Sequence, residues 1–183
     1  MPLRPEEIIE LLHLEPLPEE GGFFRETYRA AESIPADALP ARYRDRTRGR
    51  AHSTQIYFLI TPRSPSLMHL VASDEAFHHY AGDPVEQLHL TLAGEARVHW
   101  IGSDLRAGQR PQVIVPRDVW QGCRVRAGGI GWSLLGCTVS PGFDWADFRI
   151  GGRDEIHSIY RGADPAIRGL IDALTVPSKP EQA

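Results

Sequence analysis

Histidine and carboxylate side chains gather in one short stretch of the chain, residues 66–82. It contains His69, His78 and His79, three of the eight histidines, close to the carboxylate of Glu75. Imidazole nitrogens and carboxylate oxygens bind divalent metals, and the same groups transfer protons in general acid–base catalysis. The stretch therefore indicates either a metal site or an acid–base pair.

Gln121 is a further polar residue that we expect to belong to the same site. Arg124 and Arg126 should face solvent, so the alternation of a strand turns Gln121 inward. A catalytic metal needs three or four inward nitrogen or oxygen ligands, and the chain offers at most His69, Glu75 and Gln121, with His78 or His79 as an open further ligand. An amide oxygen is a poor ligand for zinc or iron, which predicts weak metal binding. The competing hypothesis is that His69 and Glu75 form an acid–base pair that contacts a ligand.

The elements that must position these residues are mainly short strands. Apolar runs are separated by Gly and Pro turns, and Leu88, Leu90 and Leu92 alternate with polar residues along one strand. The pattern predicts an antiparallel all-β sandwich or barrel. The expected strands cover 23–29, 55–60, 67–72, 75–81, 85–92, 96–101, 112–116, 119–126 and 131–139.

Two helices are expected to flank these strands, over residues 5–13 and about 164–174. Asp164 suits a helix N-cap, and Pro165 suits the first helical position. Residues 31–52 have no apolar periodicity and are predicted to form a solvated loop, although their alternating arginines left phosphate binding as an alternative. We expect one domain over residues 1–183, with a barrel core at about 22–150.

The composition is that of a globular protein and argues against a nucleic-acid-binding or membrane protein. The 183 residues are 42% hydrophobic and 24% charged, with a net charge of −4, as expected for a globular protein that binds neither nucleic acid nor an anionic membrane. No apolar run approaches the roughly 20 residues of a transmembrane helix, and the N-terminus lacks the pattern of a signal peptide. Cys123 and Cys137 lie in apolar strands and are expected to be buried free thiols, which predicts a cytoplasmic protein.

Two motifs resemble those of the cupins, a superfamily of small jelly-roll barrels. The spacing of Glu75 and Gly82 matches the first cupin motif, and His69 fits its second histidine. Leu67 stands where the first histidine is expected. The stretch from Gly108 to Gln121 resembles the second motif, with Gln121 in place of its histidine.

A closer resemblance, to the Cupin_5 family (DUF985), covers nearly the whole chain. It rests on five runs in the same order, at residues 20–29, 56–59, 74–84, 115–121 and 136–144. The resemblance implies a double-stranded β-helix (jelly-roll) barrel, a homodimer and a small-molecule ligand. It also places a histidine at His78 and an aromatic residue at His79, whereas strand alternation puts His79 on the face of Glu75. Which of the two histidines faces inward stays open.

The expected ligand pocket lies at the barrel mouth. Its predicted residues are Arg25, Tyr57, His69, Glu75, Phe77, His78, His79 and Gln121. His69 and Glu75 are the candidate catalytic pair, for proton abstraction beside a carbonyl in a sugar or keto compound. One alternative is an oxygenase or isomerase that holds iron, manganese, nickel or zinc through His69, Glu75 and Gln121. Another alternative is a ligand-binding or storage protein without chemistry.

Overall fold

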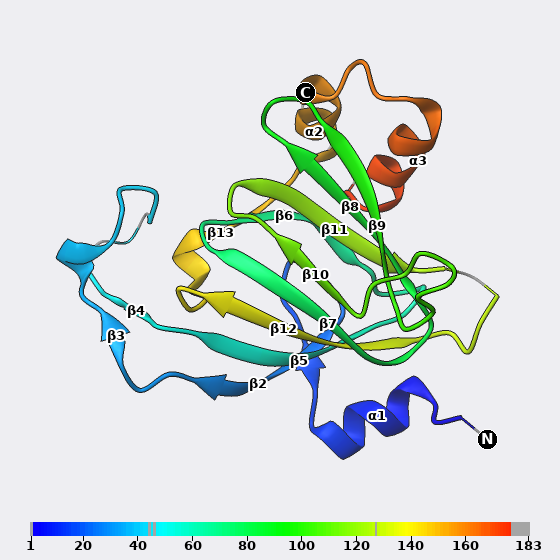
Figure 1. Ribbon diagram of the computed structural model, residues 1–183, viewed down its shortest axis with the longest axis horizontal. Coiled ribbons are helices and arrows are strands. Elements are labelled where there is room, and N and C mark those ends of the chain that lie inside the picture. The colour runs from blue at the N-terminus through cyan, green and yellow to red at the C-terminus, as the bar shows by residue number, and fades with distance from the viewer. Residues whose placement is uncertain (1, 44, 46, 127, 177–183) are drawn as a thin grey trace, which may run out of the picture.

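Two antiparallel sheets face each other in the computed structural model, which describes residues 2–43, 45, 47–126 and 128–176 (Figure 1). In order across the larger sheet lie β1 (Glu15–Pro16), β2 (Phe23–Arg29), β5 (Thr54–Ile60), β12 (Ser133–Ser140), β7 (Asp74–Gly82) and β10 (Gln112–Val115). In order across the smaller sheet lie β13 (Phe148–Ile150), β6 (Ser66–Val71), β11 (Val119–Val125), β8 (Val85–Thr91) and β9 (Ala96–Ile101). A separate short pair joins β3 (Ser33–Ile34) and β4 (Arg50–Ala51).

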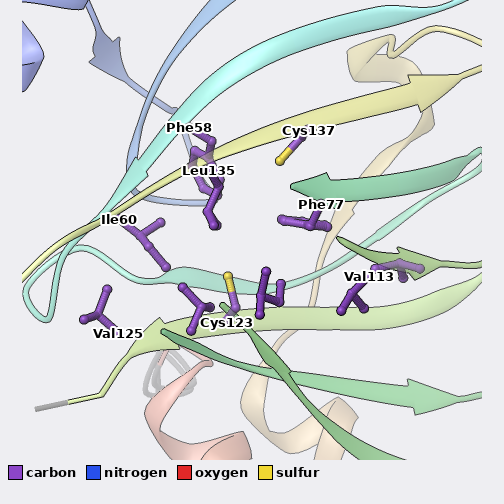
Figure 2. Packing of buried hydrophobic residues seen from close by; sticks show 11 residues of the cluster. Phe58, Ile60, Phe77, Val113, Cys123, Val125, Leu135 and Cys137 are labelled. Atoms are coloured by element: carbon purple, nitrogen blue, oxygen red, sulfur yellow. The ribbon is translucent and has the colours of Figure 1, made fainter. Parts of the chain in front are cut away.

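The predicted jelly-roll barrel is confirmed. Neighbouring strands are mostly far apart in sequence, as where β12 lies between β5 and β7, and every pairing between these strands is antiparallel. Alternate residues of each strand point between the sheets. In Figure 2, Phe58 and Ile60 of β5 and Cys137 of β12 face Cys123 of β11 across this core. The two cysteines are buried free thiols, as expected.

The outer face of the smaller sheet is covered by two C-terminal helices. Leu88 and Leu90 of β8 pack with Trp120 against α2 (Arg153–Ile159) and α3 (Pro165–Ala173). The helix α3 matches the predicted C-terminal helix, and the Asp164 carboxylate caps it by accepting from the backbone N–H of Ile167. Sequence reasoning missed α2, because a single buried side chain, Ile156, leaves no helical periodicity to detect.

The predicted N-terminal helix is present as α1 (Pro5–Leu12). It packs with Leu59 and Trp132 on the outer face of the larger sheet. Within the described residues, no helix is long and apolar enough to cross a bilayer.

The prediction that residues 31–52 form a solvated loop was wrong in part. The segment contains β3, the 3₁₀ turn η1 (Ala36–Ala38) and β4, and it buries Tyr43 completely. Arg50 is 2% exposed, and its guanidinium forms a two-pronged ion pair with Asp147, with Nε at 2.6 Å from Oδ2. This distant carboxylate makes burial of the arginine possible, and no local sequence pattern predicts it.

Candidate functional site

A cavity of about 420 Å³ lies between the two sheets. The larger sheet supplies most of its wall, and His69 and Val71 of β6 supply the smaller sheet's part. Its lining residues are Leu17, Glu20, Phe24, Glu26, Arg29, Arg48, Thr54, Ile56, His69, Val71, Glu75, Cys137, Val139, Phe143, Asp144 and Trp145. Two of the predicted pocket residues, His69 and Glu75, are thus brought together here.

The His69 ring is held in one orientation. Its Nδ1–H donates to the backbone carbonyl of Leu67 at 2.7 Å, and the ring stacks on Phe148 with 5.3 Å between centroids. A carbonyl oxygen only accepts, so this bond places the proton on Nδ1 and leaves the lone pair of a neutral ring on Nε2. The nearest carboxylate oxygen to Nε2 belongs to Glu20, at 3.9 Å, which exceeds hydrogen-bond distance.

Glu75 is anchored from the opposite sheet by Gln121, whose Nε2 donates to Glu75 Oε2 at 2.6 Å. Gln121 is fully buried and points inward, as strand alternation predicts. Its own Oε1 accepts from Gln87 Nε2 at 3.4 Å. Glu75, Gln121 and Gln87 therefore form a buried row of hydrogen-bonded side chains inside the barrel.

Sequence reasoning missed Glu20, the third polar group of the cavity floor. It is 8% exposed, and its Oε1 accepts from the hydroxyl of Ser66 at 2.7 Å. Gly21 and Gly22 follow it with φ of 94° and 71°, a conformation that glycine adopts at little cost and that turns the chain into β2. The Glu-Gly-Gly run is the sequence signal that marks this carboxylate.

Burial sets the protonation of these three groups. Desolvation raises the pKa of Glu20 to about 7, against a smaller opposite effect of its Ser66 hydrogen bond. Desolvation also raises the pKa of Glu75 to about 7, although His69 and Gln121 act to lower it. Desolvation lowers the pKa of His69, and the Glu75 charge only partly offsets this. Near neutral pH the cavity floor therefore holds a neutral imidazole beside carboxyl groups that carry protons part of the time.

The mouth of the cavity combines aromatic rings with paired charges. Phe143 and Trp145 are in edge contact at 5.2 Å between centroids, and Trp145 is 46% exposed. Arg29 forms a two-pronged ion pair with Glu26, while Arg48 contacts Asp45 and Asp144. Asp144 also caps the short helix η2 (Trp145–Asp147) by accepting from the backbone N–H of Ala146.

Arg25 lies outside the cavity. It is exposed, and its guanidinium donates to the backbone carbonyl of Leu12 at 3.2 Å. Its neighbour Glu26 lines the cavity instead, because adjacent residues of a strand point to opposite faces. Of these two neighbours the carboxylate is therefore the inward residue, and not the predicted Arg25.

The remaining predicted residues do not line the cavity. Phe77 is buried in the apolar core, and Tyr57 packs edge-on against Tyr80. His78 stacks on the exposed Tyr80 ring, so it lies on the outer face of β7. Alternation therefore puts His79 on the inner side, where its Nε2 lies 3.3 Å from the Asp83 carbonyl oxygen.

One further histidine is buried. A polar residue of a strand is often exposed, but His89 is 6% exposed and its ring lies 4.3 Å from that of His99 between centroids. Desolvation, followed by the neighbouring His99, lowers the pKa of His89 to about 3. Its neighbours Leu88 and Leu90 point to the outer face of β8, where they pack against the C-terminal helices. His89, between them, therefore faces inward.

The comparison with known families agrees with this architecture. The model of the cupin superfamily family Cupin_5 (DUF985) matches residues 6–151. The chain belongs to this family. A hypothetical protein from Leishmania major is 30% identical to this cupin, with a TM-score of 0.81 over 94% of this chain and 99% of that one. A protein from Shewanella oneidensis is 29% identical, with a TM-score of 0.81 over 97% of this chain and 100% of that one.

More distant structures share the fold alone. A cupin 2 conserved barrel domain protein from Rhodopseudomonas palustris is 12% identical, with a TM-score of 0.54 over 88% of each chain. No curated protein matches this cupin significantly in sequence. These comparisons show the family and the fold of the chain, and they do not show an activity.

The three expected metal ligands, His69, Glu75 and Gln121, are not arranged to hold a divalent metal. His69 Nε2 is free to bind a metal, but Gln121 turns its NH₂ group toward Glu75 and its oxygen toward Gln87. Leu67 supplies no donor in the place of the first histidine. Within the described residues, no group of three or more His, Cys, Asp or Glu side chains is arranged to hold a metal ion. The set His69, Glu75 and Gln121 therefore does not fit a transition metal.

Proposed function

We propose that this cupin binds a small polar molecule in its cavity and transfers protons beside a carbonyl group, as an epimerase or isomerase of a sugar or keto compound does. One observation carries the proposal. The His69 side chain is 2% exposed and lines the cavity, yet its Nε2 has no hydrogen-bond partner among the described residues. The ring is almost entirely buried and this nitrogen stays accessible from the cavity, so a bound ligand can supply the hydrogen-bond partner that the described residues do not.

The protonation states suit the two roles that such a reaction needs. His69 is neutral near pH 7 because burial lowers its pKa, so Nε2 can accept a proton from a carbon atom. The electron pair of the broken C–H bond then forms an enol, while a protonated Glu20 or Glu75 gives its proton to the carbonyl oxygen. Both carboxyl groups have a pKa of about 7, which keeps such protons available. Protonation of the enol carbon on its other face, by the second carboxyl group, gives the epimer when the enol O–H returns its proton to the carboxylate that donated it. Return of the proton from His69 to the adjacent carbon, with loss of the proton from the hydroxyl on that carbon, gives the isomer.

Exchange of substrate protons with solvent tests this proposal. The protein is incubated in D₂O with a panel of sugars and keto compounds, and loss of the α-proton signal is followed by NMR. We expect exchange for at least one compound, and we expect His69→Gln to abolish it. His52→Gln is the matched control, because His52 is exposed and does not line the cavity.

Each other result has a defined meaning. Exchange that survives in His69→Gln would remove His69 from the reaction. Binding of a panel compound, seen as a change in Trp145 fluorescence, without any exchange would favour a binding protein over an enzyme. Absence of both binding and exchange would overturn the proposal.

We also propose that the single domain expected over residues 1–183 pairs as a homodimer and acts in the cytoplasm. Tyr80 of β7 and Ile114 of β10 are 55% and 52% exposed, which supports an apolar contact on the larger sheet. The two free buried cysteines support a reducing compartment.

A further inference from the structure

Some of the charged side chains that line the cavity have a partner of opposite charge, and others have none among the described residues. The titratable and charged side chains that face it come from the strands β2, β6, β7 and β12 and from the segments before β2, before β4 and around η2. They are Glu20, Glu26, Arg29, Arg48, His69, Glu75, Cys137 and Asp144.

Both cations of this set are already occupied. Arg29 donates from Nε and Nη2 to the two oxygens of Glu26, at 3.0 and 2.7 Å. Arg48 contacts Asp45 at 3.2 Å and Asp144 at 4.0 Å. An anionic ligand would therefore have to break an existing ion pair and approach the acidic floor.

The two carboxyl groups of the floor have no cation beside them. Glu20 accepts from the Ser66 hydroxyl and Glu75 accepts from the Gln121 amide, and both donors are neutral. The His69 ring, 3.9 Å from Glu20, is kept neutral by burial. Glu20 and Glu75 are each 8% exposed, so water compensates them poorly.

We infer that the ligand of this cavity carries a positively charged ammonium group, which is held by the carboxyl groups of Glu20 and Glu75. This inference rests on the proposed function, since it names the class of ligand for the same cavity. The ammonium supplies the cation that the protein itself lacks at this place. The aromatic side chains of Phe24, Phe143 and Trp145 line the same cavity and suit the apolar body of such an amine.

Binding of an ammonium ligand changes the number of protons that the protein holds, and this change can be measured. One cation beside the two carboxyl groups favours the ionised form of one of them and lowers its pKa from about 7, while the negative charge of that group keeps a proton on the other, as the proposed reaction requires. The complex therefore releases protons to the buffer near pH 7, whereas an anionic ligand would take protons up. The thiol of Cys137 contributes nothing, because burial raises its pKa well above the ordinary value.

Three probes of one shape test the inference: benzylammonium, benzyl alcohol and benzoate. Their binding to the wild-type protein is measured by calorimetry at pH 7, in two buffers that differ in ionisation enthalpy. We expect benzylammonium to bind about tenfold or more tightly than benzyl alcohol, benzoate to bind more weakly than either, and only benzylammonium to release protons. We expect Glu20→Gln and Glu75→Gln to weaken benzylammonium by about tenfold each and to leave benzyl alcohol almost unchanged. Glu32→Gln, an exposed control, should change neither.

The probe series on the wild-type protein decides the question even where a variant fails to fold. Equal or tighter binding of benzyl alcohol or benzoate, or proton uptake with benzylammonium, overturns the inference while leaving the cavity as a ligand site. Failure of benzylammonium to bind also overturns it. The proposed function is judged separately, by whether any compound of the sugar and keto panel binds or exchanges protons.

Discussion

Gln121 Nε2 donates to Glu75 Oε2 at 2.6 Å, and this bond joins β11 of the smaller sheet to β7 of the larger one. Both side chains are buried, so the bond crosses the barrel interior out of contact with water. The Gln121 amide donates to Glu75 and turns its oxygen toward Gln87, and ionised Glu75, which can only accept, favours this orientation. This one contact connects the stability of the barrel, the ionisation of the cavity floor and the poor fit of a metal.

The first prediction concerns Gln121→Leu, which removes the donor and keeps a side chain of similar size. The Gln121 hydrogen bond lowers the pKa of Glu75, so its loss should raise that pKa above about 7. The unfolding free energy should fall by about 1–3 kcal/mol, because Gln87 and Glu75 lose a buried partner. NMR titration of the Glu75 carboxyl carbon and urea unfolding measure the two effects. Gln112→Leu, at an exposed position on the outer face of β10, is the control and should show neither effect.

The second prediction is that Glu75→Gln gains stability, relative to the wild type, as the pH rises. Glu75 has a pKa of about 7 in the native protein against an ordinary value of 4.5. Between these values the native state keeps a proton that the unfolded chain has lost, so this carboxyl destabilises the wild type increasingly as the pH rises from about 4.5 to about 7. Glutamine has no such cost. The stability difference should therefore shift by up to about 3 kcal/mol in favour of the variant across that range.

Urea unfolding at several pH values measures this shift. A difference that stays constant with pH would contradict the raised pKa of Glu75, and Glu32→Gln, at an exposed position, is the matched control. The wild type alone is less informative, because the buried histidines act with the opposite sign. His69 and His89 have lowered pKa values, so their contributions are lost as the pH falls below 6.5.

The third prediction is that removal of divalent metals leaves this cupin unchanged. The oxygen of Gln121 faces Gln87, and Leu67 has no donor atom, so a transition metal would find too few ligands. Dialysis against a chelator should leave the midpoint of thermal unfolding the same. Elemental analysis of protein purified without a metal-affinity tag should give far less than one metal per chain. A stoichiometric metal whose removal lowers the midpoint would show that the donors rearrange.

How far the sequence predicts this molecule depends on the range of the interactions involved. The alternation of Leu88 and Leu90 with polar neighbours is local, and so is the capping of α3 by Asp164, and both were predictable. Glu20 was missed because its role depends on Ser66, which β6 brings to it from far along the chain. Arg25 was misassigned because strand alternation fixes that two neighbours face opposite ways, but not which of the two faces inward.

The fourth prediction concerns Arg50, whose burial also depends on a distant partner. Arg50→Met should lower the unfolding free energy by about 3–5 kcal/mol, because it leaves the carboxylate of Asp147 buried without this cation. Arg48→Met should cost less than about 1 kcal/mol, since the Arg48 side chain is 69% exposed. Urea unfolding compares the two variants. Because Asp147 lies in η2 beside Trp145, Arg50→Met should also change Trp145 fluorescence at the cavity mouth. Equal costs for the two variants would mean that the Arg50–Asp147 pair contributes no more than a surface ion pair.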